Sequence, residues 1–361
     1  MWEMDTNDVP FDPQNVQQNK GKARVKVIRL TADRPEWNAY ISRVGGDIYA
    51  EAAYATWSTR LDAGNPALWV VEEEGQIVCI PLIERSVDAE GCLDGISPYG
   101  FGSIWRSETA EPLWITRALT ELGDVLKQSG FVSVFLRLHP FLLLPKLRVP
   151  GITWVEEGPV VWMDTTWGEQ ELLEGLSYNH RRDLQRLVDE GHTVETNTED
   201  VWAEVPNIYT ETMERVGASG YYRLTSDDLE ALRRALGGRA IAIGARNSSG
   251  DFDAISLFSA TRDHMQFLFG GSRARGLRKA ASKLVLWEAR QAARAHQCRR
   301  YILGGGVGAK EDLLFKFKAG FSPLRATYQT VRWVINHGLY TELAHGFTTG
   351  RHFPVYRSPL S

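Results

Sequence analysis

The chain has 361 residues, of which 43% are hydrophobic, and a formal net charge of -4. This length exceeds what one hydrophobic core usually organises, so we expect two domains. The charge excludes a global attraction to polyanions, and any contact with nucleic acid must rest on local basic patches. The three cysteines Cys79, Cys92 and Cys298 lie far apart, which argues against a disulfide framework and a cysteine-based zinc site.

The N-terminal region has no basic start followed by an apolar segment, so no signal peptide is expected. No apolar run reaches about 18 residues, the length that a membrane-spanning helix needs. We therefore expect a soluble, cytoplasmic protein without stable membrane insertion. Residues 1–24 are polar, rich in Asn, Gln, Asp and Pro, and are predicted to form a flexible tail.

Two segments of the chain have the same order of predicted elements. In the first, residues 67–87 read as two strands around a Glu-Gly turn, followed by the loop "SPYGFGS", a helix over 112–130 and a strand over 131–140. In the second, residues 240–261 read as two strands around Ser-Gly-Asp, followed by "FLFGGSRARG", a helix over 279–297 and a strand over 299–306.

The spacing between matching residues changes slowly along these segments. Gly75 and Gly250 are 175 positions apart, whereas Val134 and Tyr301 are 167 apart. Such an offset predicts two copies of one α/β unit. The alternative is that any two α/β halves look alike at this level of detail.

The predicted boundary lies in "EEGPVVWMDTTWGEQELL", where a strand ends and a helix begins, with Thr165 or Thr166 as its cap. We predict a first domain over residues 25–165, a second over 166–345 and a C-terminal tail over 346–361. The next helix, "YNHRRDLQRLVDEG", has a basic face that includes His180 and Arg181. This face is either a solvated surface or one that meets an anion.

Residues 211–224, "ETMERVGASGYYRL", predict a helix that stops and a loop that presents aromatic side chains. The guanidinium of Arg215 suits a carboxylate or a phosphate, because its forked donors bind either group in a bidentate manner. Tyr221 and Tyr222 would lie beside it. The alternative is a capped helix with buried tyrosines.

Residues 270–283, "GGSRARGLRKAASK", resemble a pyrophosphate-binding loop of acyl-CoA enzymes only in part. That loop usually reads Q/R-x-x-G-x-G/A and ends at a helix N-terminus. Here Arg273-x-x-Gly276 is followed by Leu277 and Arg278, so the last small residue is missing. This departure counts against ordinary acetyl-CoA binding.

The stretch "YILGGGVGAKEDLLFKFKAGFSP", residues 301–323, combines a strand, three glycines and a helix. The glycines Gly304, Gly305 and Gly306 would let the backbone approach a ligand. In the helix, Phe317 and Phe321 form an i, i+4 pair predicted to pack inward, while Lys318 faces a cleft. A lysine held beside a reacting ester stabilises the developing oxyanion. The alternative is that Lys316 and Lys318 only solvate the helix.

Several of these stretches together resemble the Fem-type family of aminoacyl-tRNA-dependent peptidyltransferases. They are "YNHRRDLQRLVDEG", "IYTETMERVGASGYY", "FGGSRARG" and "YILGGGVGAKEDLLFKFKAGFSP", and "SPYGFG" resembles the family's pyGyGg loop. The resemblance covers roughly residues 95–325. It implies an α/β (α+β) fold of two tandem GNAT-like domains, each a mixed sheet flanked by helices, without a coiled-coil arm.

The resemblance also implies an activity, in which an amine attacks the ester of an aminoacyl-tRNA to form an amide. It places Lys318 at the reacting end. The implied substrate-binding residues are Tyr99, Arg215, Tyr221, Tyr222, Gly304, Gly305, Gly306 and Phe317. A basic patch suited to the phosphates of a tRNA acceptor stem comprises Arg273, Arg275, Arg278, Lys279 and Lys283.

The expected partners are an aminoacyl-tRNA and a small-molecule or peptide amine, such as a peptidoglycan precursor or a metabolite, with no DNA. We expect no cofactor and no metal, since the eight histidines show no paired ligand spacing. Two alternatives stay open. One is an acyl-CoA-dependent GNAT N-acyltransferase, and the other is a catalytically silent tandem-GNAT binding protein.

Overall fold

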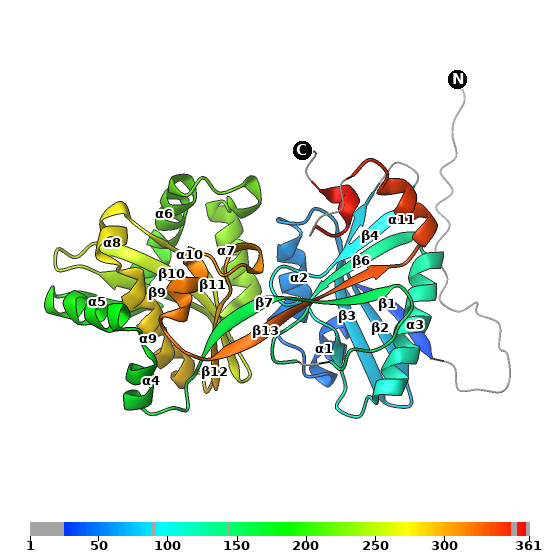
Figure 1. Cartoon of the computed structure of the whole chain (residues 1–361), viewed down its shortest axis with the longest axis horizontal. Helices are drawn as coiled ribbons and strands as arrows, with labels where there is room; N and C mark the ends of the chain where they lie inside the picture. The colour runs from blue at the N-terminus through cyan, green and yellow to red at the C-terminus, as the bar shows by residue number, and fades with distance from the viewer. Residues whose placement is uncertain (1–24, 88–90, 143, 348–351, 359–361) are drawn as a thin grey trace, which may run out of the picture.

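The computed structural model describes residues 25–87, 91–142, 144–347 and 352–358, so the predicted tail over 1–24 lies outside the described residues. Figure 1 shows two lobes, each a sheet flanked by helices, and two strands that run from one lobe into the other. These strands are β7 (Ile152–Asp164) and β13 (Arg325–Val334). The described residues form a 13-stranded sheet in the order β1-β2-β3-β4-β6-β13-β7-β12-β11-β10-β9-β8, with β5 paired to β3.

The first half follows the predicted order of elements. Its hairpin turns at Glu74 and Gly75, whose φ angles of 48° and 84° suit the tight turn of a two-residue hairpin. The elements are β1 (Lys26–Thr31), α1 (Glu36–Arg43), η1 (Ile48–Ala50), α2 (Ala52–Ser58), β2 (Asn65–Glu73), β3 (Gln76–Ser86), β4 (Leu93–Ile96), β5 (Trp105–Arg106), α3 (Pro112–Gln128) and β6 (Phe131–Arg137).

The second half begins after β7. Its elements are α4 (Glu169–Gly175), α5 (Tyr178–Asp189), β8 (Thr193–Thr196), α6 (Glu199–Arg215), η2 (Gly220–Tyr222), α7 (Ser226–Leu236), η3 (Gly237–Arg239), β9 (Ala240–Arg246), β10 (Phe252–Thr261), β11 (His264–Ser272), α8 (Ala274–Lys279), α9 (Ser282–Ala295), β12 (Arg300–Gly304), η4 (Val307–Ala309), α10 (Leu313–Ala319), β13, α11 (His337–Leu343) and η5 (Val355–Arg357).

The two halves repeat one topology. In the first, β4 pairs antiparallel with β3 and parallel with β6. In the second, β11 pairs antiparallel with β10 and parallel with β12. The repeat therefore extends to strand direction, as the slowly changing offset predicts.

Each half of the sheet is extended by one of the two crossing strands. β13 pairs with β6 of the first half, and β7 pairs with β12 of the second. β7 and β13 also pair with each other along nearly their whole length, which makes the sheet continuous. The residue limits of the two domains stay a prediction. Within the predicted C-terminal tail, Tyr356 hydrogen-bonds Ser133 of β6, so residues near it pack on the first half.

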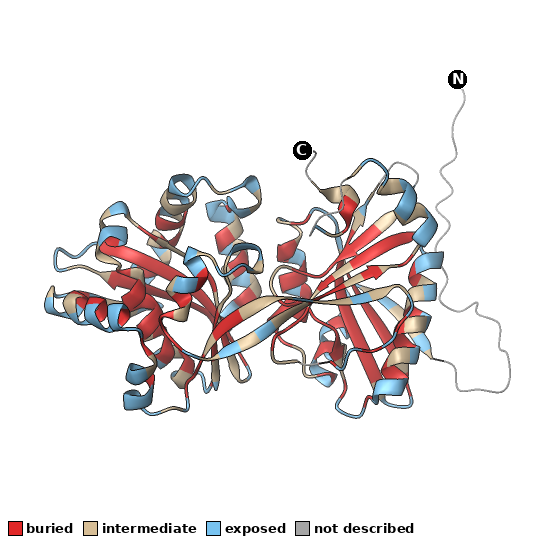
Figure 2. Ribbon diagram, viewed as in Figure 1, coloured by how far each residue is buried: buried red, intermediate tan, exposed pale blue. Residues whose placement is uncertain are grey.

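A hydrophobic cluster joins the halves. It contains Trp57 and Phe101 of the first half together with Val205 and Phe269 of the second. The Trp57 indole also donates to the Asp228 backbone oxygen at 2.9 Å. Figure 2 shows buried residues filling the sheets of both lobes, while many residues of the crossing β7 and β13 are only partly buried.

Two local predictions are wrong. The cap of α4 is Gly168, because Thr165 donates its hydroxyl to the Cys298 backbone oxygen instead. The helix predicted over 279–297 is preceded by a separate short helix, α8, and the break falls at Ala280, which has a φ of 59°. In the part of the chain that the structure describes, no helix is both long and apolar enough to cross a membrane.

Candidate functional site

The site is built where two parallel strands of the second half separate. β11 and β12 are paired only from His264 and Arg300 to Gln266 and Ile302. Beyond this point their backbones no longer bond to each other, and the chain leaving β12 enters the three glycines. The ends of these strands therefore present backbone groups that the sheet does not use.

Lys318 lies in this gap. Its ammonium donates to the Gly305 backbone oxygen at 2.8 Å, on the β12 side, and lies 5.3 Å from the centre of the Phe267 ring, on the β11 side. Only 7% of Lys318 is exposed. That Lys318 faces a cleft stays a prediction, and its side chain is buried beside the glycine loop, where it contacts the Gly305 oxygen.

Phe317 of α10 and Phe321, which follows the end of this helix, hold the arrangement in place. Phe317 and Phe321 have ring centres 5.6 Å apart, which confirms the predicted i, i+4 pair, and both contact the core of the second half. The helix begins after Asp312, whose carboxylate accepts from the backbone of Phe315 at 2.8 Å and of Val307 at 3.0 Å. Asp312 thereby ties the glycine loop to the helix that carries Lys318.

Burial lowers the pKa of Lys318 to about 8, and the charge of Asp312 opposes this shift in part. Within the described residues, no carboxylate lies within ion-pair distance of the ammonium. A lysine with this pKa stays mostly protonated at neutral pH. The gap therefore holds a positive charge that the protein itself does not neutralise.

The glycines are required by the loop itself. Gly304 has a φ of 90°, which other residues rarely adopt. A Cβ on Gly306 would lie 2.1 Å from the Lys310 backbone oxygen. The absent side chains thus allow the loop to fold on itself, which the sequence analysis attributed to a ligand. The N–H groups of Gly305 and Gly306 have no acceptor among the described residues.

His180 of α5 is not part of a cationic surface. Its imidazole is bonded on one side to the Ser177 hydroxyl at 3.0 Å and on the other to the Phe317 backbone oxygen at 2.9 Å. Burial, together with the charge of Lys283, lowers the pKa of His180 to about 4. The neutral ring donates to α10 and packs so closely that a Cβ on Gly320 would lie 2.4 Å from it. His180 positions the helix of Lys318.

The predicted basic patch is largely neutralised by carboxylates. Arg273 pairs with Glu204 at 2.5 Å, Lys279 with Glu190 at 2.8 Å, and Lys283 with Asp183 at 2.6 Å. Arg275 pairs with Asp251 and Asp253. The Lys283 pair is buried, so this lysine does not face solvent as the prediction requires. Arg278 is exposed and has no ion-pair partner in the described part of the chain.

A carboxylate also occupies the start of α8. The backbone N–H of Ala274 donates to Glu211 at 2.9 Å. Gly276 is packed against β10, since a Cβ there would lie 2.1 Å from the Asp253 backbone oxygen. The position where a pyrophosphate would meet backbone N–H groups is therefore filled by a side chain with the same sign of charge.

Arg215 lies beside the same loop. It donates to the Ser272 backbone oxygen at 2.7 Å and pairs with Glu211 at 3.4 Å. These contacts tie the end of α6 to the end of β11. Its predicted role in substrate binding stays a prediction.

The three predicted tyrosines come together across the two halves. Tyr99, from the loop after β4, stacks on Phe269 of β11 at 5.7 Å, and its ring centre lies 6.3 Å from that of Tyr221. Tyr221 in turn contacts Tyr222 at 5.0 Å. The Tyr221 hydroxyl donates to Asp62 of the first half at 3.0 Å. The structure thus joins residues that are 122 positions apart in the sequence.

Sequence reasoning missed Arg137, the last residue of β6, which lies near these tyrosines. Burial lowers the pKa of Arg137, whereas the charges of Tyr221, Tyr328, Asp62 and Tyr99 raise it. The net shift of this pKa is upward. The only signal in the sequence is a charge at the end of the apolar run "FVSVFLR".

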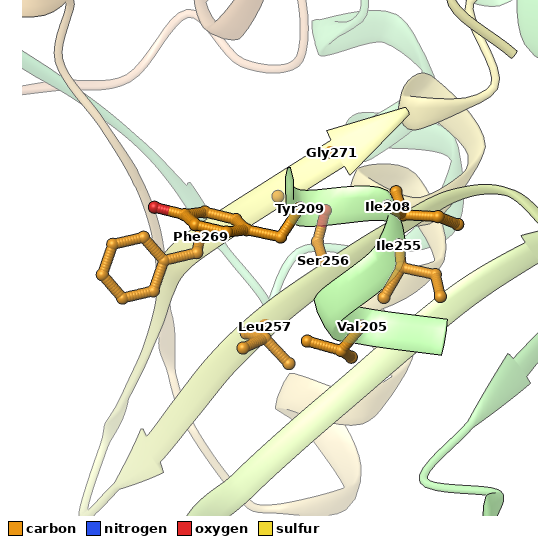
Figure 3. Close-up of a pocket in the computed structure, with 9 residues that line it drawn as sticks. Val205, Ile208, Tyr209, Ile255, Ser256, Leu257, Phe269 and Gly271 are labelled. Carbon is orange, nitrogen blue, oxygen red and sulfur yellow. The ribbon is translucent and has the colours of Figure 1, made fainter. Parts of the chain in front are cut away.

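Figure 3 shows a small cavity beside this aromatic group, between α6 and the strands β10 and β11. Its volume is about 10 Å³, and Tyr209, Phe269 and Gly271 are among the residues that line it. This is room for a single water molecule. A larger hollow of about 500 Å³ lies between the halves, lined by Asn38, Glu51, Arg239 and Arg262 among others. In the described residues, no group of three or more His, Cys, Asp or Glu side chains suits a metal ion.

The fold has known counterparts among solved structures. It is similar to FemX, with a TM-score of 0.65 and 14% identity over 88% of this chain and 99% of that one. It is also similar to L-PGS from Bacillus licheniformis, with a TM-score of 0.53 and 14% identity over 86% and 95% of the two chains. A third is the C-terminal domain of a putative lysylphosphatidylglycerol synthetase from Agrobacterium fabrum, with a TM-score of 0.54 and 14% identity over 84% and 93%.

No family model matches the chain, and no curated protein matches its sequence. At 14% identity these likenesses concern the fold. The chain has a Fem-like fold of two tandem GNAT-like units, each a mixed sheet flanked by helices, and the predicted fold class is confirmed. The described residues contain no coiled-coil arm, since the longest of their helices, α3 and α6, have 17 residues each.

Proposed function

We propose that the protein is an aminoacyl-tRNA-dependent aminoacyltransferase, which forms an amide between a tRNA-borne amino acid and the amine of a peptidoglycan precursor or a small metabolite. The observation that carries this proposal is the buried ammonium of Lys318 in the gap between β11 and β12. The N–H groups of Gly305 and Gly306 belong to the loop whose Gly305 oxygen accepts from this ammonium. Such fixed donors stabilise negative charge in a site from which water is largely excluded.

The proposed reaction balances without a further reactant. The amine nitrogen attacks the carbonyl carbon of the ester. The carbonyl oxygen of the ester gains negative charge, which Lys318 stabilises. The bond between the carbonyl carbon and the ribose oxygen then breaks, and the new C–N bond remains as the amide bond. One proton of the amine ends on the released ribose hydroxyl. Lys318 stays an ammonium throughout, so it acts as an electrostatic catalyst rather than as a base.

The start of α8 favours tRNA over acyl-CoA as the source of the transferred group. An acyl-CoA pyrophosphate needs the free N–H groups of this helix start. Here Ala274 already donates to Glu211, whose charge would also repel the pyrophosphate. This supports the earlier interpretation of the missing small residue at Arg278.

The tRNA contact is proposed on the exposed cations near this site. Arg278 of α8 and Arg181 of α5 are exposed and, in the described residues, have no ion-pair partner. Lys279 is 45% exposed beside Glu190 and keeps its place in the proposal. Lys283 does not suit the role, because its ammonium is buried against Asp183.

Transfer of a labelled amino acid tests the proposal. The protein is incubated with bulk charged tRNA and a panel of amines, with and without RNase, and in parallel with labelled acetyl-CoA. We expect an amine-dependent product from charged tRNA that RNase abolishes, and none from acetyl-CoA. A product formed only from acetyl-CoA would establish the alternative N-acyltransferase. Turnover of neither donor would favour a binding protein.

A further inference from the structure

The first half contains a counterpart of the Lys318 gap, formed by its own parallel strands β4 and β6. The loop after β4 fills it. Ser97 donates its backbone N–H to the Phe135 oxygen at 2.9 Å, and Ser103 donates to the Arg137 oxygen at 2.9 Å. Arg137 itself donates its backbone N–H to the Ser97 hydroxyl at 3.0 Å. These bonds fix the backbone of Arg137 at the mouth of the gap.

The side chain of Arg137 is only partly satisfied. It donates one hydrogen bond, from Nη1 to the Ser97 backbone oxygen at 3.1 Å. A guanidinium carries five N–H donors. In the described part of the chain no carboxylate lies within 4.0 Å of it, whereas most buried or half-buried arginines of this protein have such a partner. Charges removed from water are normally paired, because desolvation is costly.

The nearest acidic group is already engaged. Asp62 accepts from the Tyr221 hydroxyl at 3.0 Å and lies 3.5 Å from Arg85. It influences Arg137 through space without contacting it. Arg137 therefore keeps an unmatched positive charge in a half-buried position that solvent still reaches.

Aromatic side chains lie near this charge, and the guanidinium carbon of Arg137 is 5.5 Å from the centre of the Phe135 ring. Tyr99, Tyr221 and Tyr328 are close enough to act on Arg137 electrostatically. The hydroxyls of Tyr99 and Tyr328 have no hydrogen-bond partner among the described residues. Two further donors therefore accompany the guanidinium, beside rings that offer an apolar wall.

We propose that Arg137 binds a carboxylate of the acceptor, with the tyrosines holding the apolar part next to it. This inference rests on the proposed function, because it names the chemical class of the amine substrate. A single guanidinium matches one carboxylate in a bidentate manner. A phosphate dianion would bring a second negative charge close to Asp62, so the carboxylate fits better.

Tyr99 and Lys318 both contact the strand β11. Tyr99 stacks on Phe269, which lies two residues along β11 from Phe267. Phe267 faces the ammonium of Lys318. A bulge in β11 falls between these two phenylalanines, and they pack in different hydrophobic clusters, so their rings lie on opposite faces of the sheet.

Binding without any donor separates this inference from the proposed function. Isothermal titration calorimetry compares amino acids and dipeptides with their C-terminal amides, using wild type, Arg137→Gln, Arg137→Lys and Arg148→Gln, a control at an exposed arginine of the first half. Circular dichroism verifies that each variant is folded. Inorganic phosphate serves as the competing anion.

We expect at least one carboxylate to bind wild type about tenfold more tightly than its amide, since a charge-assisted pair is worth about 1.5 to 3 kcal/mol. Arg137→Gln should remove this preference, Arg137→Lys should keep part of it, and Arg148→Gln should leave it unchanged. Equal binding of every carboxylate and its amide to wild type would overturn the inference, as would a preference that survives Arg137→Gln. Stronger competition by phosphate than by any carboxylate would also overturn the assignment of the anion.

Discussion

Replacing Lys318 by Met separates catalysis from stability, because the structure predicts opposite effects on the two. The ammonium is 7% exposed, and burial lowers its pKa from 10.5 to about 8. At about 1.4 kcal/mol per pKa unit, holding the charge in the folded chain costs roughly 3 kcal/mol at neutral pH. Methionine removes this cost with a side chain of similar length.

The substitution also has a cost. The hydrogen bond to the Gly305 oxygen is lost, which is worth about 1 kcal/mol. We therefore expect Lys318→Met to raise the free energy of unfolding by about 2 kcal/mol at pH 7. Turnover should fall by about a hundredfold, the usual loss when one oxyanion donor is removed. Binding of the acceptor should change little.

Urea unfolding followed by tryptophan fluorescence gives the stability, and single-turnover transfer from charged tRNA gives the rate. Lys316→Met is the matched control, because Lys316 is an exposed residue of the same helix, and it should alter neither quantity. A Lys318→Met protein that is less stable than wild type would contradict the calculated cost of burial. Near-normal turnover in that variant would refute the oxyanion role.

Three further predictions concern the same region. Because the pKa of Lys318 is lowered to about 8, the unfolded chain binds more protons than the folded chain between pH 8 and 10.5, so this residue makes the free energy of unfolding rise with pH over that window. Turnover should fall above about pH 8 as the ammonium loses its proton. Urea melts and rate profiles at several pH values check both results, and a rate that is flat to about pH 10 would exclude an essential ammonium. Gly306→Ala should lower the free energy of unfolding by about 1 to 3 kcal/mol, since its Cβ would overlap the Lys310 oxygen. Gly308→Ala, which has open space around the Cβ, should lower this free energy less in the same melts. Arg278→Ala should reduce the slope of log affinity for charged tRNA against log salt concentration by about 0.7 to 0.9, and an unchanged slope would place Arg278 outside the tRNA contact.

Local sequence was enough for the features that depend on neighbours along the chain. The Glu74-Gly75 turn followed from turn chemistry, and the Phe317-Phe321 pair followed from the helical period. The fold could be predicted for the same reason, because the repeated hairpin, loop, helix and strand leave a regular pattern. The break at Ala280 could not, since alanine seldom adopts a positive φ and the residue gives no signal of one.

The site was harder to predict because it depends on contacts between distant residues. Arg275 looks like a free cation in the sequence, yet the fold brings Asp253 to it. His180 is neutral because α10 lies over it, 137 residues further along the chain. Among the described residues, Arg137 meets a backbone oxygen of the loop after β4 and forms no ion pair, which depends on contacts that the sequence does not show. Charged residues in the sequence therefore identified candidates for ligand binding. Ion pairs and hydrogen bonds formed in the fold decided which of them stay available to a ligand.

Amide formation from a tRNA ester can be measured by the stoichiometry of the transfer. Purified protein is given tRNA charged with labelled amino acids and an accepting amine, and the label that survives mild alkali is counted against the deacylated tRNA released. Amides survive this treatment and aminoacyl esters do not. The account predicts one alkali-stable product per tRNA released, with prior RNase abolishing both. Release of tRNA without a stable product, or a stable product that forms after RNase treatment, would contradict it.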